Sequence, residues 1–207
     1  MNQYPNFILL YIMELQKNKK GGNTMELGDI IDRCQLGDLD AFHELYRIYY
    51  KKAFGTAYLI CSDRTLSEDI VQEAFFVCYK SIKQLKDSSL FNTWFYKTVV
   101  RLSWRMHRKQ GKVAAPTSVD SCNIISFDCF INAENKLILR DSINQLSGPL
   151  KTVIVLYYYN DFSIRDISKI TGCLEGTVKS RLYKARNCIK NSISEPELSQ
   201  LKELEAK

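Results

Sequence analysis

The feature that most constrains the fold is the stretch of residues 161–190, which has the pattern of two short helices joined by a glycine turn. Ser163 is a residue type that caps helix N-termini, and isoleucines recur behind it at helical spacing. Gly172 suits the left-handed position that ends many helices. In the second helix, apolar residues form one stripe and basic residues lie off it. This pattern is typical of a helix-turn-helix, whose second helix enters the DNA major groove.

Helix pairs with a glycine turn are common, and spacing alone leaves plain packing and DNA binding as equal alternatives. The string GTVKSRLYKAR at residues 176–186 resembles the recognition helix in region 4 of sigma-type transcription initiation factors. The resemblance extends over residues 139–186 and implies contact with a promoter −35 element. Because a helix enters the groove by its N-terminal turns, early positions face bases and later cations face phosphates. The residues expected at this DNA are Glu175, Thr177, Lys179, Ser180, Arg181, Lys184 and Arg186.

A further helical pattern covers residues 91–110, which contain two tryptophans and no acidic residue. Lys97, Arg101 and Arg105 are spaced by four, so they form one stripe along a helix. Such a stripe is usually only a solvated helix face. Interleaved with aromatic residues, it also suits a phosphate backbone with unstacked bases. The aromatic residues here, which the pattern allows to be packed or exposed, are Trp94, Tyr96 and Trp104.

Residues 91–99, FNTWFYKTV, resemble region 2.3 of the same factors, and the similarity runs into region 2.4 through Arg108. The resemblance implies capture of melted non-template bases of the −10 element. The family's usual Arg-Asn pair and following Asp are replaced here by Val100-Arg101 and Arg105, so its base preference is not carried over. Instead we expect greater reliance on phosphate contacts. The residues expected at the −10 element are Trp94, Tyr96, Lys97, Arg101, Trp104, Arg105 and Arg108.

A cluster of acidic and amide side chains, Asp69, Gln72 and Glu73, lies early in another predicted helix that begins near Thr65. Carboxylates at a helix N-terminus favour the helix dipole, so a solvated surface is a sufficient explanation. However, SEDIVQEAF at residues 67–75 resembles region 2.2 of extracytoplasmic-function sigma factors. That resemblance implies that these three residues bind the clamp of core RNA polymerase.

Cysteine usage and charge exclude several other classes of protein. Seven cysteines without a CxxC pair, in a chain with only two histidines, disfavour structural zinc and a disulfide framework. A thiol enzyme lacks an evident paired base. We expect buried, reduced thiols in a cytoplasmic protein, with no catalytic residue, metal, cofactor or small-molecule substrate. The net charge of +6 favours an anionic partner without identifying it.

The N-terminal residues 1–24 differ from the rest. The apolar run 7–15 is too short to span a bilayer and lacks the flanking features of a signal peptide. The codons for residues 21–25 can contain a purine-rich run about seven bases before the ATG of Met25. This is the arrangement of a ribosome-binding site. We therefore expect translation to start at Met25; a genuine N-terminal arm is the alternative.

The sequence thus predicts an all-α protein with two helical domains and an extended linker, the second domain containing the helix-turn-helix. The resemblance identifies it as an extracytoplasmic-function sigma factor, with core RNA polymerase and promoter DNA as partners. An anti-sigma factor, often membrane-anchored, is the family's usual further partner. A helix-turn-helix regulator that does not join polymerase is the alternative. The expected segments are an extension at 1–24, domains at 25–111 and 134–191, a linker at 112–133 and an acidic tail at 192–207.

Overall fold

The computed structural model describes residues 24–110 and 142–192, here called the first and the second domain. Both ranges are helical and contain no strand, which confirms the predicted all-α fold. Apart from residues 24 and 192, the expected extension, linker and acidic tail lie outside the described residues. The expected domain boundaries therefore stay predictions.

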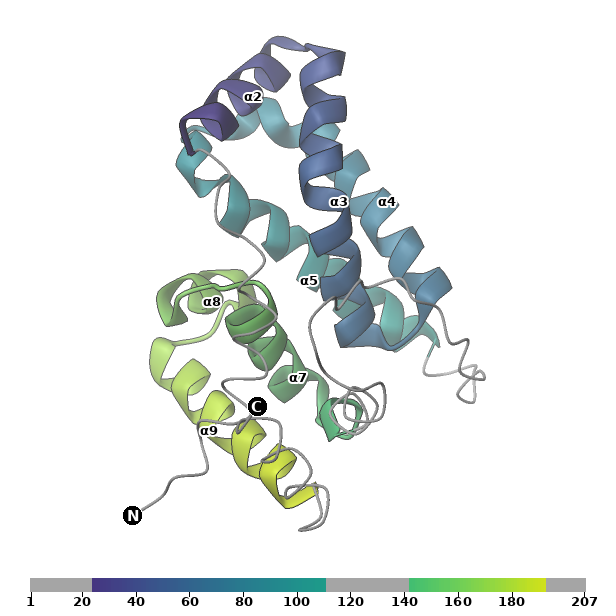
Figure 1. Cartoon of the computed structure of the whole chain (residues 1–207), viewed down its shortest axis with the longest axis vertical. Helices are drawn as coiled ribbons and strands as arrows, with labels where there is room; N and C mark the ends of the chain where they lie inside the picture. Colours follow the sequence, from purple (N-terminus) through teal and green to yellow (C-terminus); the bar gives the residue numbers. More distant parts are fainter. Residues whose placement is uncertain (1–23, 111–141, 193–207) are drawn as a thin grey trace, which may run out of the picture. The chain divides into compact units, whose positions relative to one another are not determined.

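The first domain is built from long helices that pack on one another around an aromatic core (Figure 1). Helix α3 packs against α2, α4 and α5, and α4 also packs against α5. Two short 3-10 turns, η1 and η2, connect α4 to α5. The bounds are α2 (Thr24–Leu36), α3 (Leu39–Cys61), α4 (Arg64–Ser81), η1 (Ile82–Gln84), η2 (Ser88–Leu90) and α5 (Phe91–Gln110).

Local signals in the sequence set where α3 and α4 begin and end. The Asp38 side chain accepts hydrogen bonds from the first backbone N–H groups of α3, as an N-cap residue does. Ser62, at a left-handed φ of 57°, ends that helix. The Oδ1 atom of Asp63 then accepts from the Leu66 N–H at 2.8 Å, so Asp63 is the N-cap of α4.

Stacked and edge-on aromatic rings fill the centre of the first domain. Phe91 and Phe95 are fully buried on α5, and their ring centroids lie 5.1 Å and 5.6 Å from that of Tyr49 on α3. Phe75 on α4 completes the cluster at 5.0 Å from Phe95. The Tyr49 hydroxyl also donates to the side-chain oxygen of Asn92. These contacts fix α5 against α3 and α4, and burying each phenylalanine stabilises the fold by about 1.5–3 kcal/mol.

The second domain contains a helical turn near residue 143 followed by three helices (Figure 1). Pro149 occupies the first turn of α7, where its missing N–H has no partner to lose. The apolar run that follows is helical and almost entirely buried, although its last turn is a π-helix. Helix α7 packs against α9. The bounds are α7 (Gly148–Ile154), η3 (Val155–Tyr159), α8 (Ile164–Thr171) and α9 (Glu175–Ser192).

The helix-turn-helix predicted at residues 161–190 is present as α8 and α9. The Asp166 N–H donates to Ser163 Oγ at 3.1 Å, so Ser163 caps α8. Gly172 follows α8 with a φ of +70°, a conformation that side-chain-bearing residues rarely adopt, and lets the chain turn. Ile167 and Ile170 are buried at the expected helical spacing.

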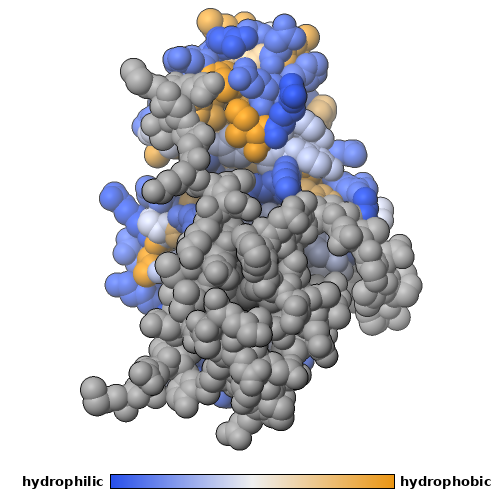
Figure 2. Space-filling view, in the orientation of Figure 1, coloured by the Kyte–Doolittle hydropathy of each residue, from blue (hydrophilic) through white to orange (hydrophobic). Residues whose placement is uncertain are grey.

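The visible surface of the first domain is mainly hydrophilic, with apolar areas among the polar ones (Figure 2). None of the helices in the described ranges combines the length and hydropathy needed to cross a membrane. The large apolar side chains exposed on the first domain are Leu36, Leu39, Ile48, Phe76, Tyr79 and Leu90.

Candidate nucleic-acid and polymerase interfaces

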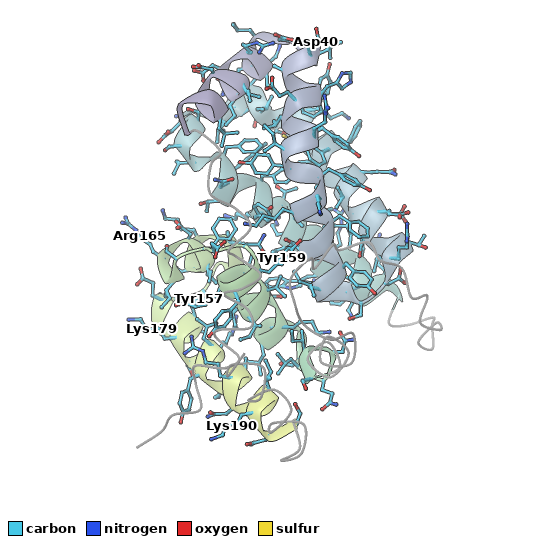
Figure 3. All side chains as sticks on the ribbon, in the orientation of Figure 1. Asp40, Tyr157, Tyr159, Arg165, Lys179 and Lys190 are labelled. Carbon is cyan, nitrogen blue, oxygen red and sulfur yellow. The ribbon has the colours of Figure 1, made fainter. Side chains whose placement is uncertain are left out.

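Helix α9 is divided into a buried stripe and a wide exposed face. The stripe is the one predicted from helical spacing, and it consists of Val178, Leu182, Ala185 and Ile189. Off that stripe, Glu175, Lys179, Ser180 and Lys184 are exposed, as the predicted DNA contacts require. Figure 3 shows Lys179 near the start of α9 and Lys190 near its end. The exposed face of the helix is therefore polar and carries more cations than acids.

The other three predicted DNA contacts on α9 are half-buried: Thr177, Arg181 and Arg186. Both arginines make contacts within their own domain. Arg181 Nη1 donates to the Cys173 sulfur in the turn at 3.7 Å. Arg186 Nε donates to the Tyr158 hydroxyl at 2.8 Å, and its guanidinium lies over two tyrosine rings. The two arginines thus lie at the edges of the exposed face, whereas the lysines lie within it.

Tyr183 is a residue of this face that the sequence reasoning missed. Its side chain is 66% exposed, which is unusual for a large aromatic residue. It lies three and four residues after Ser180 and Lys179, so all three share one side of α9. The signal for it in the sequence is that an aromatic residue lies off the apolar stripe of a basic helix.

Helix α5 presents the predicted basic stripe to solvent. Lys97, Arg101, Arg105 and Arg108 are all exposed. Arg101 and Arg105 form no ion pair with any residue of the two described ranges. The Arg108 Nε donates to the backbone oxygen of Trp104 at 3.3 Å, which directs that guanidinium back along the helix.

The aromatic residues of α5 differ in their access to solvent. Trp94 and Trp104 are half-buried, so each keeps part of its ring at the surface. Tyr96 is only 3% exposed, and its ring lies edge-on to Phe95 at 5.7 Å. A base cannot stack on a ring in this position, so Tyr96 is corrected from a candidate DNA contact to a core residue. The sequence pattern left Tyr96 either packed or exposed, and in the structure it lies beside the inward-facing residues that pack on α3.

The predicted polymerase-binding residues lie on the outer face of α4. Asp69 and Gln72 are exposed and Glu73 is half-buried. The same face continues toward the end of the helix with Phe76 and Tyr79, which are 51% and 52% exposed. The sequence reasoning did not identify this aromatic extension. The face is therefore acidic near its start and aromatic near its end.

Lys80 adds a cation to that aromatic end. Its Nζ lies 4.0 Å from the centroid of the Phe76 ring, within the range of a cation–π contact. Tyr79 in turn packs edge-on to Phe42 of α3 at 5.2 Å. These contacts hold the exposed rings in defined positions.

The cysteines follow the prediction in part. Cys34, Cys61 and Cys78 are buried as expected, whereas Cys173 is half-buried and Cys188 is exposed. Burial raises the pKa of the Cys34 thiol to about 11 and that of Cys78 to about 12. Within residues 24–110 and 142–192, no group of three His, Cys, Asp or Glu side chains is arranged to hold a metal ion.

Two family models match the chain in the order of its domains. "Sigma-70 region 2" matches residues 45–113, and "Sigma-70, region 4" matches residues 136–189. The first match includes α4 and α5, and the second includes α8 and α9 up to Ile189. Each proposed surface therefore falls inside a matched region.

Full-length relatives show the same similarity. An ECF RNA polymerase sigma-E factor of Haemophilus influenzae is 31% identical over 179 residues, which is 79% of this chain and 93% of that protein. The ECF RNA polymerase sigma factor SigW of Bacillus subtilis is 27% identical over 176 residues, covering 79% of this chain and 94% of SigW.

Solved structures share the fold at lower identity. The sigma factor RpoE, in complex with the anti-sigma factor NepR from Bartonella quintana, has a TM-score of 0.62 at 19% identity. The alignment covers 73% of this chain and 95% of that one. CnrH, in complex with the cytosolic domain of CnrY, has a TM-score of 0.61 at 17% identity, covering 80% of this chain and 95% of that one. The chain belongs to the extracytoplasmic-function sigma factors, which direct RNA polymerase to specific promoters.

Proposed function

We propose that three helices of this sigma factor each bind a different target. Helix α4 binds core polymerase, α5 binds the −10 element and α9 binds the −35 element. The observation that supports this most strongly is that the predicted basic stripe of α5 in the first domain and the predicted lysines of α9 in the second are both exposed. A regulator that only binds DNA needs the second domain alone.

At the −35 element, the exposed N-terminal face of α9 enters the major groove. Lys179, Ser180 and Tyr183 are close enough to the start of the helix to reach base edges. Lys184 lies one turn further along and contacts a phosphate. Glu175 and Thr177 flank the entry point and orient the first turn.

At the −10 element, the basic stripe of α5 follows the backbone of the melted strand. Lys97, Arg101 and Arg105 recur every 6 Å or so along the helix axis and so meet successive negative charges. The exposed parts of Trp94 and Trp104 offer π-faces for unpaired bases. Tyr96 supports this surface from the core.

On the polymerase, the outer face of α4 contacts the clamp. Asp69, Gln72 and Glu73 supply hydrogen-bond acceptors and charge. Phe76 and Tyr79 supply the apolar area that a stable protein interface needs, since buried aromatic residues contribute most to such contacts. The aromatic end of α4 thus extends the acidic contact.

The proposed partners also include an anti-sigma factor that covers these surfaces until transcription is required. The structurally similar RpoE was solved in complex with an anti-sigma factor, NepR, and CnrH in complex with the cytosolic domain of CnrY. The protein acts in the cytoplasm, where its polymerase and promoters are. Its contribution is recognition and DNA opening, while the polymerase performs the covalent chemistry.

Binding to core polymerase separates this function from that of a helix-turn-helix regulator. We expect wild-type protein to co-elute with core polymerase from the same host. Asp69→Ala combined with Glu73→Ala should weaken the complex by at least about tenfold. The matched control, Asp29→Ala with Asp32→Ala, removes two exposed acids from α2 and should bind normally. DNA binding by wild-type protein without any complex with core polymerase would instead support the regulator.

A further inference from the structure

Arg186 makes a three-part contact with a tyrosine pair on another helix of its domain. Besides the 2.8 Å hydrogen bond to the Tyr158 hydroxyl, its Cζ lies 5.7 Å from the Tyr157 ring centroid and 5.6 Å from that of Tyr158. The two rings pack edge-on, with centroids 4.8 Å apart. Figure 3 shows Tyr157 in the second domain with α9.

The tyrosine pair lies in η3, the π-helical end of the α7 segment. The Asn160 N–H donates to the Val155 oxygen at 3.1 Å, and the Phe162 N–H donates to the Leu156 oxygen at 3.1 Å. The first of these bonds joins residues five apart and closes a π-helical turn. Such π-helical turns are rare and occur frequently at functional sites. Both tyrosines lie within this turn and contact Arg186 of α9.

The Tyr158 side chain is a fixed anchor for α9. It is only 2% exposed, and burial raises its pKa although the neighbouring guanidinium lowers it in part. The phenol is therefore protonated at neutral pH, and its oxygen accepts the Arg186 hydrogen bond. A planar guanidinium that is hydrogen-bonded and stacked has little freedom to rotate.

Directional contacts lie on both flanks of the apolar stripe of α9. Arg186 follows Ala185 on one side of the stripe, and Arg181 precedes Leu182 on the other, where it contacts Cys173. Apolar packing sets the distance of α9 from α7 but discriminates poorly among small rotations, because it is not directional. Hydrogen bonds on the flanks do discriminate among them.

We propose that Arg186 is a positioning residue, which fixes the rotation of α9 by binding Tyr157 and Tyr158 and so determines which side chains reach the DNA bases. A rotation of 20° or so moves the outer surface of a helix by about 2 Å, given a radius of about 5–6 Å. Such a shift breaks a base contact that depends on hydrogen-bond distance. This inference rests on the proposed function, because it concerns the same −35 surface.

Two conservative variants test the positioning role. Tyr158→Phe removes only the hydroxyl, and Arg186→Lys keeps the charge but loses the planar fork. Each is assembled with core polymerase and tested on a promoter at which wild-type holoenzyme initiates, and on a copy with its −35 element replaced. Both variants should lower the discrimination between the two DNAs by at least about fivefold, the effect of losing one base contact. Melting temperatures identify any variant that does not fold.

The salt dependence of binding distinguishes positioning from a direct phosphate contact. If Arg186 positions α9 without contacting a phosphate, Arg186→Ala leaves the slope of log K against log salt unchanged. The comparison variant, Lys184→Ala, should reduce the slope by about 0.9 and retain discrimination. The positioning role is refuted if Tyr158→Phe discriminates between the two DNAs as well as wild type does and Arg186→Ala reduces the salt slope by about 0.9. Failure of wild-type holoenzyme to prefer the intact promoter would count instead against the proposed function.

Discussion

Replacing Arg101 and Arg105 with alanine removes two neighbouring cations from the exposed face of α5. Both side chains are exposed and form no ion pair within residues 24–110 and 142–192. Their removal therefore leaves no buried charge without a partner, and the helix should stay folded. The effect should be confined to the interaction with nucleic acid.

The size of that effect follows from counterion release. Each phosphate contact contributes about 0.7 to the salt slope on single strands and about 0.9 on duplex DNA. Losing two contacts should reduce the slope by about 1.4–1.8. Between about 50 and 200 mM salt, wild-type affinity should then fall about 7- to 12-fold more than the affinity of the double variant.

The assay is a salt titration of holoenzyme binding to a promoter at which that holoenzyme initiates. A matched control replaces Arg47 and Lys51, an exposed pair with the same spacing on α3, with alanine. The control changes net charge by the same amount and should retain most of the wild-type slope. Equal slopes for wild type and the Arg101/Arg105 variant would refute the assignment of this stripe to DNA.

Three further predictions concern the fold. Asp63→Ala should lower the free energy of unfolding by about 1 kcal/mol in a denaturant titration, because α4 loses its N-cap; no change would mean that water replaces the cap. At neutral pH an alkylating reagent should modify the exposed Cys188 well before Cys34 and Cys78, whose buried thiols have raised pKa values, as peptide mass spectrometry would show. Hydrogen bonds from first-turn backbone N–H groups and from the neighbouring Arg33 lower the pKa of Asp38. The Asp38 carboxylate therefore stabilises the fold above the unfolded pKa of about 4, and this stabilisation is lost as the pH falls below it. Asp38→Asn should make the acid-induced loss of stability shallower, and an identical pH profile would contradict this.

Local signals explain why much of the fold was predictable from the sequence. The cap at Asp63, the left-handed Gly172 and the apolar stripe of α9 each depend on residues a few positions apart. Such features persist when the chain folds because tertiary packing agrees with them. The same holds for α5, whose bounds, Phe91–Gln110, coincide with the predicted helix.

Features that depend on contacts distant in sequence were not predictable in this way. Tyr96 has the aromatic side chain that a base-stacking surface needs. Only its packing in the core shows that its ring is not accessible to a base. Arg186 resembles the other cations of α9 in sequence, but its partner Tyr158 is 28 residues away and requires a π-helical turn. The exposed Phe76 and Tyr79 would have been assigned to the core by hydrophobicity alone.

Run-off transcription with purified core polymerase tests the central claim most directly. Genomic fragments of the host are transcribed by core polymerase with and without the protein. We expect discrete transcripts that require the protein and disappear when the −35 or the −10 element of their promoter is replaced. Transcription that is identical with and without the protein, across fragments covering the genome and with a functional core enzyme, would contradict its function as a sigma factor.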